Sequence, residues 1–418
     1  MRTKEFIRQD MIKNSLANTP QITFEVTDAC NLNCFYCGYG KIYSDHDERT
    51  NKKLEFTKAK LFLDYLSALW NSSLNKSINN VIHVSFYGGE PLLNVPFIEK
   101  VIGYTKGLKK QVRKFAYSMT TNGMLIDKNM NFLASNDFSL LISLDGDEFN
   151  NSYRVNKSGR NSYSHVIENI DKLKLIHPEY FNKRVNFNAV IHNRNSVTAI
   201  FDFFKKRYNK VPRIGALNIT GIRPEMQEEF LKMYQNTMDS LFKSENYGEI
   251  ESEMFLASPT FQSATVFLMQ HSEFKYENYN ELLYGKIENN QAYPTGTCLP
   301  FSRKVFITVN GKILPCERIG HQFALGEITN DSVNLDFEEI AQKYNHYFAK
   351  LDSQCSKCYN SRSCIQCIFN LQDIEKNKCS CNGFMNEKKF QSYKNAQLSF
   401  LARHPEAYAR IMNDVIYR

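Results

Sequence analysis

Residues 21–37, QITFEVTDACNLNCFYC, join a β-rich run to three closely spaced cysteines. Residues 21–26 are rich in β-branched and aromatic side chains, which is typical of a strand. Cys30, Cys34 and Cys37 follow that strand in a short polar loop. The stretch therefore predicts a strand whose carboxyl end carries a reactive or metal-binding loop.

The alternation of strand and helix continues through the first half of the chain. Further strands are expected at residues 81–87, 114–119, 139–144, 185–191 and 216–220, with helices between them at 57–70, 95–107, 127–134, 163–175 and 196–208. This order predicts an α/β fold with a parallel sheet, either an open doubly wound sheet or a barrel. In both architectures the functional residues lie at the carboxyl ends of the strands.

Unusual residues follow the next three strands, as this rule requires. They are Gly88-Gly89-Glu90-Pro91, Thr121-Asn122-Gly123 and Asp145-Gly146. Each motif alone is a common turn signal. Because each stands after a strand, we expect them to meet the cysteine loop at one edge of the sheet.

The composition excludes several classes of protein. Of the 418 residues, 42% are hydrophobic and 23% charged, as in ordinary globular proteins. No apolar run approaches the ~18 residues that span a bilayer, and the N-terminus has no apolar segment typical of a signal peptide, so we expect no membrane partner and a cytoplasmic location. The net charge of +8 is a mild surplus. The basic stretches lack aromatic interleaving, and we expect no nucleic-acid partner.

The eleven cysteines are unevenly placed, three near the start and eight between Cys298 and Cys381. In a reducing compartment such cysteines usually bind metal or react. The first three can wrap one inorganic centre but cannot complete its coordination, whereas a closed zinc site takes four ligands. A [4Fe–4S] cluster with one open iron is the better match.

The second set of cysteines surrounds a hairpin signal and two C-x-x-C pairs. Asn310-Gly311, between Cys298 and Cys316, predicts a hairpin over residues 304–314 with a type I′ turn. The remaining members are Cys355, Cys358, Cys364, Cys367, Cys379 and Cys381. Taken alone, the paired C-x-x-C units favour a zinc ribbon.

The first set, C-x-x-x-C-x-Tyr-C with Tyr36, resembles the hallmark of the radical S-adenosylmethionine (SAM) superfamily. The resemblance implies a partial (β/α)6 TIM-type barrel, a [4Fe–4S] cluster on Cys30, Cys34 and Cys37, and SAM on its open iron. One electron from the cluster then cleaves SAM to a 5′-deoxyadenosyl radical that abstracts hydrogen. By position, the residues implied to bind SAM are Tyr36, Gly88, Gly89, Glu90, Asn122, Ser143, Asp145 and Arg154, with Arg154 meeting the SAM carboxylate.

The second set resembles the SPASM extension of radical SAM peptide-modifying enzymes, which implies two auxiliary [4Fe–4S] clusters and three clusters in all. The resemblance implies Cys298, Cys316 and Cys367 for the first auxiliary cluster. It implies Cys355, Cys358 and Cys364 for the second, completed by Cys379 or Cys381. In this chain two residues separate Cys364 from Cys367, whereas relatives usually have three. The Cys379-x-Cys381 pair at the end of the region is also unusual. The assignment of Cys379 and Cys381 to a cluster therefore stays open.

The resemblance implies an oxidoreductase that crosslinks or dehydrogenates a ribosomally made precursor peptide. Glu317, directly after Cys316, matches an acidic residue that accepts a substrate proton in sulfatase-maturing relatives. The implied partners are the peptide and an electron donor such as flavodoxin or ferredoxin. The alternatives are an anaerobic sulfatase-maturing, formylglycine-generating enzyme and, from another class, a non-catalytic iron–sulfur electron carrier.

The sequence divides into five expected regions. They are an N-terminal extension (1–20), the barrel (21–223), a helical bridge (224–295), the SPASM region (296–385) and a C-terminal helix (386–418). Some peptide maturases bind the leader segment of their precursor peptide with a separate N-terminal module, and the 1–20 extension is too short to be one. We therefore expect the leader to be bound by the barrel surface, the helical bridge or a partner.

Overall fold

The computed structural model describes residues 5–77, 81–108, 114–271, 294–361, 364–371, 373–376 and 379–416. These residues fall into two compact units. The barrel unit lies within 13–247 and 300–336, and the C-terminal unit within 1–12, 248–299 and 337–418. Residues 1–4 of the expected extension and 272–293 of the expected bridge lie outside the described residues.

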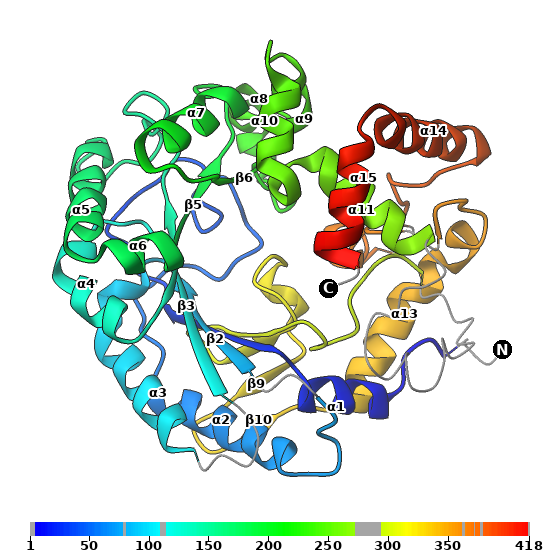
Figure 1. The fold of residues 1–418 in the computed structure, drawn as a ribbon. Helices are drawn as coiled ribbons and strands as arrows, with labels where there is room; N and C mark the ends of the chain where they lie inside the picture. Colours follow the sequence, from blue (N-terminus) through cyan, green and yellow to red (C-terminus); the bar gives the residue numbers. More distant parts are fainter. Residues whose placement is uncertain are drawn as a thin grey trace. The chain divides into compact units, whose positions relative to one another are not determined.

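Six parallel strands form the centre of the barrel unit (Figure 1). They are β1 (Gln21–Thr27), β2 (Val81–Gly88), β3 (Lys114–Thr121), β4 (Ser139–Ser143), β5 (Val185–Val190) and β6 (Arg213–Gly215), paired in chain order. The predicted α/β fold with a partial barrel of six strands is confirmed. Only the sixth strand is misplaced: it precedes the predicted residues 216–220 because it pairs with β5 and ends where β5 ends.

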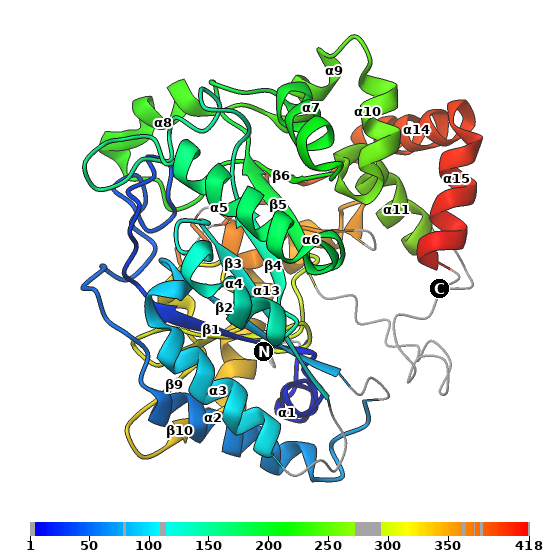
Figure 2. The same cartoon turned by 60° about the vertical axis from the view of Figure 1, so that its left-hand side comes forward.

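Amphipathic helices cover the outer face of these strands (Figure 2). They are α2 (Phe56–Trp70), α3 (Val95–Gly107), α4 (Ile126–Ser135), α5 (Tyr163–Ile176), α6 (Pro178–Arg184) and α7 (Val197–Tyr208). In α2 the buried residues Ala59, Phe62, Leu63 and Leu66 recur at the three- and four-residue spacing that places them on one face. Each crossover therefore buries a stripe of apolar side chains against the sheet.

Four short strands extend the sheet beyond β1. They are β7 (Val305–Ile307), β8 (Lys312–Leu314), β9 (Gly326–Ile328) and β10 (Val333–Asn334). β7 runs parallel to β1, and the strands that follow are antiparallel to their neighbours. The expected SPASM residues 300–336 thus belong to the barrel unit.

The predicted hairpin is present, but its type I′ turn is wrong. Gly311 has φ 86°, whereas Asn310 is not among the residues with positive φ. Gly311 N donates to Thr308 O at 2.9 Å, and Thr308 N donates to Lys312 O at 3.0 Å, so the loop is longer than two residues. Val309, inside this loop, donates its N–H to Glu25 of β1, which favours the longer turn.

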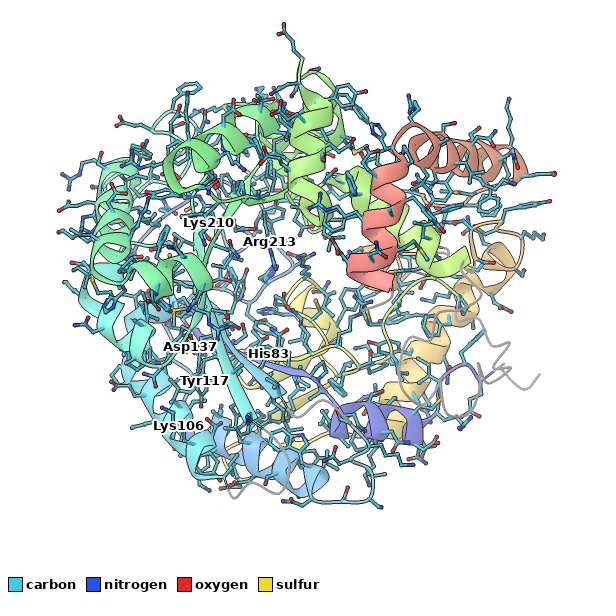
Figure 3. All side chains as sticks on the ribbon, viewed as in Figure 1. His83, Lys106, Tyr117, Asp137, Lys210 and Arg213 are labelled. Atoms are coloured by element: carbon cyan, nitrogen blue, oxygen red, sulfur yellow. The ribbon has the colours of Figure 1, made fainter. Side chains whose placement is uncertain are left out.

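Figure 3 labels Tyr117 and Asp137, two polar side chains of the barrel unit that have structural partners. The Tyr117 hydroxyl lies 2.8 Å from Thr105 Oγ1, which joins β3 to α3. Arg184 Nε donates to Asp137 Oδ1 at 2.7 Å, which joins the end of α6 to the turn two residues before β4. These polar groups stabilise the barrel. The candidate functional residues lie instead at the carboxyl ends of the strands.

The C-terminal unit is helical. Its helices are α10 (Tyr247–Met254), α11 (Pro259–His271), α13 (Phe337–Cys355), α14 (Glu387–Arg403) and α15 (Pro405–Ile411). Phe261, Ala264, Phe400 and Ile411 form one buried cluster of α11, α14 and α15. The expected C-terminal helix is thus two helices, interrupted before Pro405.

Two short helices, α8 (Gln227–Met233) and α9 (Thr237–Phe242), close the first part of the barrel unit. Across the described residues, no helix combines the length and hydropathy needed to cross a membrane.

Candidate functional site

The three N-terminal cysteines converge on one loop after β1. Cys37 N donates to Cys34 O at 3.2 Å, and Leu32 N lies 3.4 Å from Cys30 Sγ. Burial raises the pKa of Cys34 to about 12, Arg154 lowers it, and the charges of Cys37 and Cys30 raise it further. The thiols are therefore close enough to influence one another.

This donor set fits an iron–sulfur cluster. Thiolates are the usual ligands of such clusters, and each cysteine binds a different iron. In the described part of the chain, no group of three Cys, His, Asp or Glu side chains has the geometry of a site for a single metal ion. A cavity of about 320 Å³ adjoins Cys30, and its other lining residues are Asp28, Leu32, Asn33, Arg49, Asn51 and Lys157.

Gly88 and Gly89 allow a close approach between β2 and the start of the cysteine loop. Gly88 has φ 123°, and a Cβ there would lie 2.3 Å from Thr27 O. A Cβ on Gly89 would lie 2.1 Å from Ala29 O. Because no side chain fits at either position, the glycines fix the loop that bears Cys30 against the end of β2.

Glu90 is fully buried and accepts three hydrogen bonds. Its donors are Leu92 N at 3.1 Å, Thr121 Oγ1 at 2.8 Å and Asn122 N at 2.7 Å. Burial raises the pKa of Glu90 to about 7, and these hydrogen bonds lower it. The carboxyl group thus ties the end of β2 to the end of β3. Its expected role in binding SAM stays a prediction.

Asn122 connects this junction to the cysteines. Its Nδ2 donates to Asn31 Oδ1 at 2.7 Å and lies 3.5 Å from Cys30 Sγ. Ser143 is the last residue of β4 and is partly buried. Both residues therefore stand at carboxyl strand ends, where the sequence predicted them.

Asp145 lies at the centre of a buried polar network. Arg154 Nη2 donates to Asp145 Oδ1 at 3.0 Å, and Arg154 Nε lies 3.0 Å from Oδ2. The Tyr36 hydroxyl donates to Oδ2, and Val190 N donates to Oδ1 at 2.9 Å. Burial opposes ionisation, but Arg154 and His192 lower the pKa of Asp145 to about 2.

Arg154 and Asp145 are therefore each other's partners. Both are expected SAM-binding residues, yet the charge of Arg154 is already neutralised by its ion pair with Asp145. Direct contact of Arg154 with a SAM carboxylate stays a prediction.

Tyr87 links the cysteine loop to the acidic candidate. Its ring lies 6.4 Å from that of Phe306 on β7. Burial raises the pKa of Tyr87 to about 12, and the charges of Glu317 and Cys37 add to this rise. The half-buried Tyr87 side chain thus packs between β2 and β7, in the unit that also holds the first cysteine set and the predicted base.

Glu317 is held by a neighbouring lysine. Lys304 Nζ donates to Glu317 Oε1 at 3.0 Å, with 24% and 17% of the two side chains exposed. Glu317 Oε2 lies 3.7 Å from Cys316 Sγ. The carboxylate is therefore half-enclosed, ion-paired and adjacent to a predicted cluster ligand.

A stack of rings lies behind the cysteine loop. The centroids of Tyr39 and His46 are 4.8 Å apart, and those of His46 and His321 are 4.9 Å apart. His321 Nδ1 accepts from Asp47 N at 3.2 Å. Burial, followed by the charge of His46, lowers the pKa of His321 to about 4, so this ring is neutral near pH 7.

The C-terminal unit gathers most of the second cysteine set. Burial raises the pKa of Cys355 to about 11, and Cys364, Cys381 and Cys358 also raise it. Cys381 in turn interacts with Cys364 and Cys358. These four cysteines lie near one another, and the choice between Cys379 and Cys381 as the remaining cluster ligand stays a prediction.

Cys298 and Cys367 form a second neighbouring pair in this unit. Thr297 Oγ1, next to Cys298, accepts from Ile368 N at 2.8 Å. A Cβ on Gly296 would lie 1.8 Å from Cys364 O, so only glycine fits there. Cys316, expected to share a cluster with this pair, belongs to the barrel unit.

Sequence reasoning missed Tyr87 and His192. Tyr87 looks like an ordinary aromatic strand residue, and His192 follows β5, where no motif draws attention to it. Their position after or at the end of a strand was the available signal.

Comparisons with known proteins identify the family of this chain. The family model described as the radical SAM superfamily matches residues 24–179. The cysteine-type anaerobic sulfatase-maturating enzyme of Clostridium novyi (strain NT) is 30% identical over 79% of this chain and 82% of its own length. The radical SAM cyclopropyl synthase TigE of Paramaledivibacter caminithermalis is 28% identical over 50% of this chain, which spans 43% of TigE.

Another relative is also matched only in part. The uncharacterized protein MJ0907 of Methanocaldococcus jannaschii is 32% identical over 42% of this chain and 54% of its own length. The chain thus spans about half the length of these two relatives.

A solved structure agrees over nearly the whole chain. Native anSMEcpe with bound AdoMet and the Kp18Cys peptide covers 94% of this chain and 99% of its own, with a TM-score of 0.59 and 20% identity. This likeness to a solved structure shows the fold. The sequence match to the Clostridium enzyme shows in addition that the two chains belong to one family. The protein is a member of the radical SAM superfamily.

Proposed function

We propose that this protein is a peptide maturase that removes two hydrogen atoms from a ribosomally made precursor peptide, to form a crosslink or a double bond. The observation that carries this proposal is the position of Glu317, which is ion-paired to Lys304, lies 3.7 Å from Cys316 Sγ and belongs to the same compact unit as the cysteine loop. A hydrogen-abstracting centre and a proton acceptor that serve one substrate must lie near each other.

The residues of this chain would have two roles: some would hold the cofactors, and one would accept a proton. Cys30, Cys34 and Cys37 would hold the catalytic cluster, with Asn122 supporting Cys30. When bound, SAM and the clusters supply one-electron chemistry, namely reductive SAM cleavage, hydrogen abstraction and acceptance of the second electron. A flavodoxin or ferredoxin would be the external electron donor.

Glu317 would accept the proton that leaves the substrate. Its partner Lys304 orients the carboxylate before the reaction by donating to Oε1 at 3.0 Å.

A second candidate function is anaerobic sulfatase maturation, in which a Cys or Ser residue becomes formylglycine. The match to the Clostridium novyi enzyme over 82% of that enzyme favours it. Both reactions remove two hydrogens from a side chain, so the same residues serve either.

The test presents the reconstituted, reduced full-length chain and SAM with two kinds of substrate. One is the set of short peptides encoded next to its gene, and the other is a sulfatase-derived peptide with Cys or Ser at the target position. Mass spectrometry should find a loss of two hydrogens in a neighbouring peptide. A sulfatase peptide oxidised to the aldehyde would instead establish the second function.

Controls separate these outcomes from background chemistry. Cys34→Ala should abolish both 5′-deoxyadenosine formation and product. Unchanged peptide mass with inverted stereochemistry would contradict the oxidative proposal, and binding of clusters without SAM cleavage would indicate an electron carrier.

A further inference from the structure

Arg49 approaches the first cysteine set from Asp-Glu-Arg at residues 47–49, which lie beyond the C-x-x-x-C-x-x-C motif. Its Nη2 lies 3.3 Å from Cys37 Sγ, and it lines the cavity next to Cys30. One guanidinium therefore contacts the sulfur of Cys37 and shares a cavity with Cys30.

The surrounding chain fixes Arg49 in this place. The guanidinium carbon lies 4.7 Å from the centroid of the Tyr39 ring. The next residue, Thr50, donates its N–H to Asp28 Oδ2 at 2.9 Å. Because Asp28 follows β1 directly, the segment around Arg49 is attached to the strand that carries the cysteines.

Arg49 also has a donor in need of an acceptor. Its Nε is buried and, in the described part of the chain, has no hydrogen-bond partner. A buried unpaired donor costs free energy, so this geometry favours an acceptor that is added when the site is filled.

Two other cations near the cysteines differ from Arg49. Arg154 acts on Cys34, but Asp145 compensates its charge. Lys157 lines the same cavity but is exposed. Arg49 is therefore partly buried and differs from both in its contact with a cysteine sulfur at 3.3 Å.

We propose that Arg49 is a positioning residue for the catalytic cluster: it donates to the Cys37 sulfur and its positive charge stabilises the cluster in the reduced, more negative state. This inference rests on the proposed function, which places a cluster on Cys30, Cys34 and Cys37. Hydrogen bonds to cluster sulfurs and local charge are the means by which proteins set such potentials.

The experiment compares Arg49→Gln and Arg49→Lys with Lys41→Gln in the reconstituted full-length chain. Lys41 lies just beyond the cysteine loop and is ion-paired to Glu229 at 3.7 Å, so Lys41→Gln removes one charge without removing a sulfur contact. Iron content is measured first. A redox titration then follows the part of the paramagnetic resonance signal that changes when SAM is added, which reports the catalytic cluster.

Arg49→Gln should bind the same amount of iron but hold about tenfold less reduced cluster at a fixed potential, a midpoint about 59 mV more negative for one electron. Arg49→Lys should recover part of the shift because it keeps the charge. Lys41→Gln should match the wild type.

Wild-type midpoints in both Arg49 variants would overturn the inference. Iron loss in Arg49→Gln with a wild-type midpoint in Arg49→Lys would also overturn it, because it would assign a structural role. A wild-type protein with no SAM-sensitive signal would instead refute the proposed function itself, and this inference with it.

Discussion

Arg154 and Asp145 form a buried two-point ion pair, with Nη2–Oδ1 and Nε–Oδ2 distances of 3.0 Å. The pair closes a loop within the segment that follows β4. Asp145 also accepts a hydrogen bond from Val190 N of β5. Asp145, which is expected to bind SAM, thus connects the ends of β4 and β5.

Arg154→Gln should destabilise the protein by about 3–5 kcal/mol, because Asp145 would remain buried without its counter-ion. Denaturant unfolding of the reconstituted chain measures this loss. The double variant Arg154→Gln/Asp145→Asn should recover part of it. Equal stability of Arg154→Gln and wild type would show that water or another cation replaces the arginine.

Glu90→Gln should cost about 1–3 kcal/mol, because the amide NH₂ of glutamine would face one of the three N–H or O–H donors that Glu90 accepts. Unfolding curves measure the change. SAM affinity, measured by calorimetry, separates the roles: an unchanged affinity per folded molecule would assign Glu90 to the strand junction alone.

Cys381→Ala should remove about one cluster's worth of iron, whereas Cys379→Ala should leave the iron content close to wild type. The reason is that backbone contacts hold the segment of Cys381 against the first C-x-x-C pair: Cys381 N donates to Gln354 Oε1 at 3.0 Å, and Met385 N lies 3.4 Å from Cys358 Sγ. Iron and sulfide analysis after anaerobic reconstitution measures both. The reverse pattern would make Cys379 the ligand, and zinc in place of iron would support a ribbon.

Glu317→Gln should still yield 5′-deoxyadenosine but lower peptide turnover by about 100-fold or more, since a positioned base contributes this much. Lys304→Met is the matched variant: it keeps the carboxylate but removes its ion-pair partner. It should lower turnover less. Full product formation by Glu317→Gln would rule out an obligatory base at this position.

Acidification should weaken the fold through His321. The pKa of this ring is lowered by burial, so below the unfolded value of ~6.5 the unfolded chain binds more protons than the folded chain. Stability should therefore fall from pH 8 to pH 6, by about 1 kcal/mol from this group. His321→Gln should show a smaller loss over the same range, and identical slopes would contradict the assignment.

The strands were predictable because each has a compact apolar run and a following turn motif. The C-x-x-x-C-x-x-C loop and the two glycines were also predictable, because residue type and spacing are enough to recognise these motifs. The sequence does not reveal that Glu90 faces inward, because this depends on which strand ends become neighbours. It does not reveal that Arg154 pairs with Asp145, because this depends on how the segment after β4 folds back on itself. The turn at Asn310 escaped prediction because Glu25, far away in the chain, accepts the N–H of Val309.

The pairing of β1 with β7 has a consequence for folding. These strands are separated by most of the barrel sequence, yet β7 covers the side of β1 that β2 leaves open. Until residues 305–307 have been synthesised, the growing chain presents β1 as an unprotected edge, the kind of surface on which chains aggregate. Long-range pairing of this kind also slows folding. Production of this protein should therefore depend on chaperones and low temperature, and a barrel fragment that ends before β7 should aggregate.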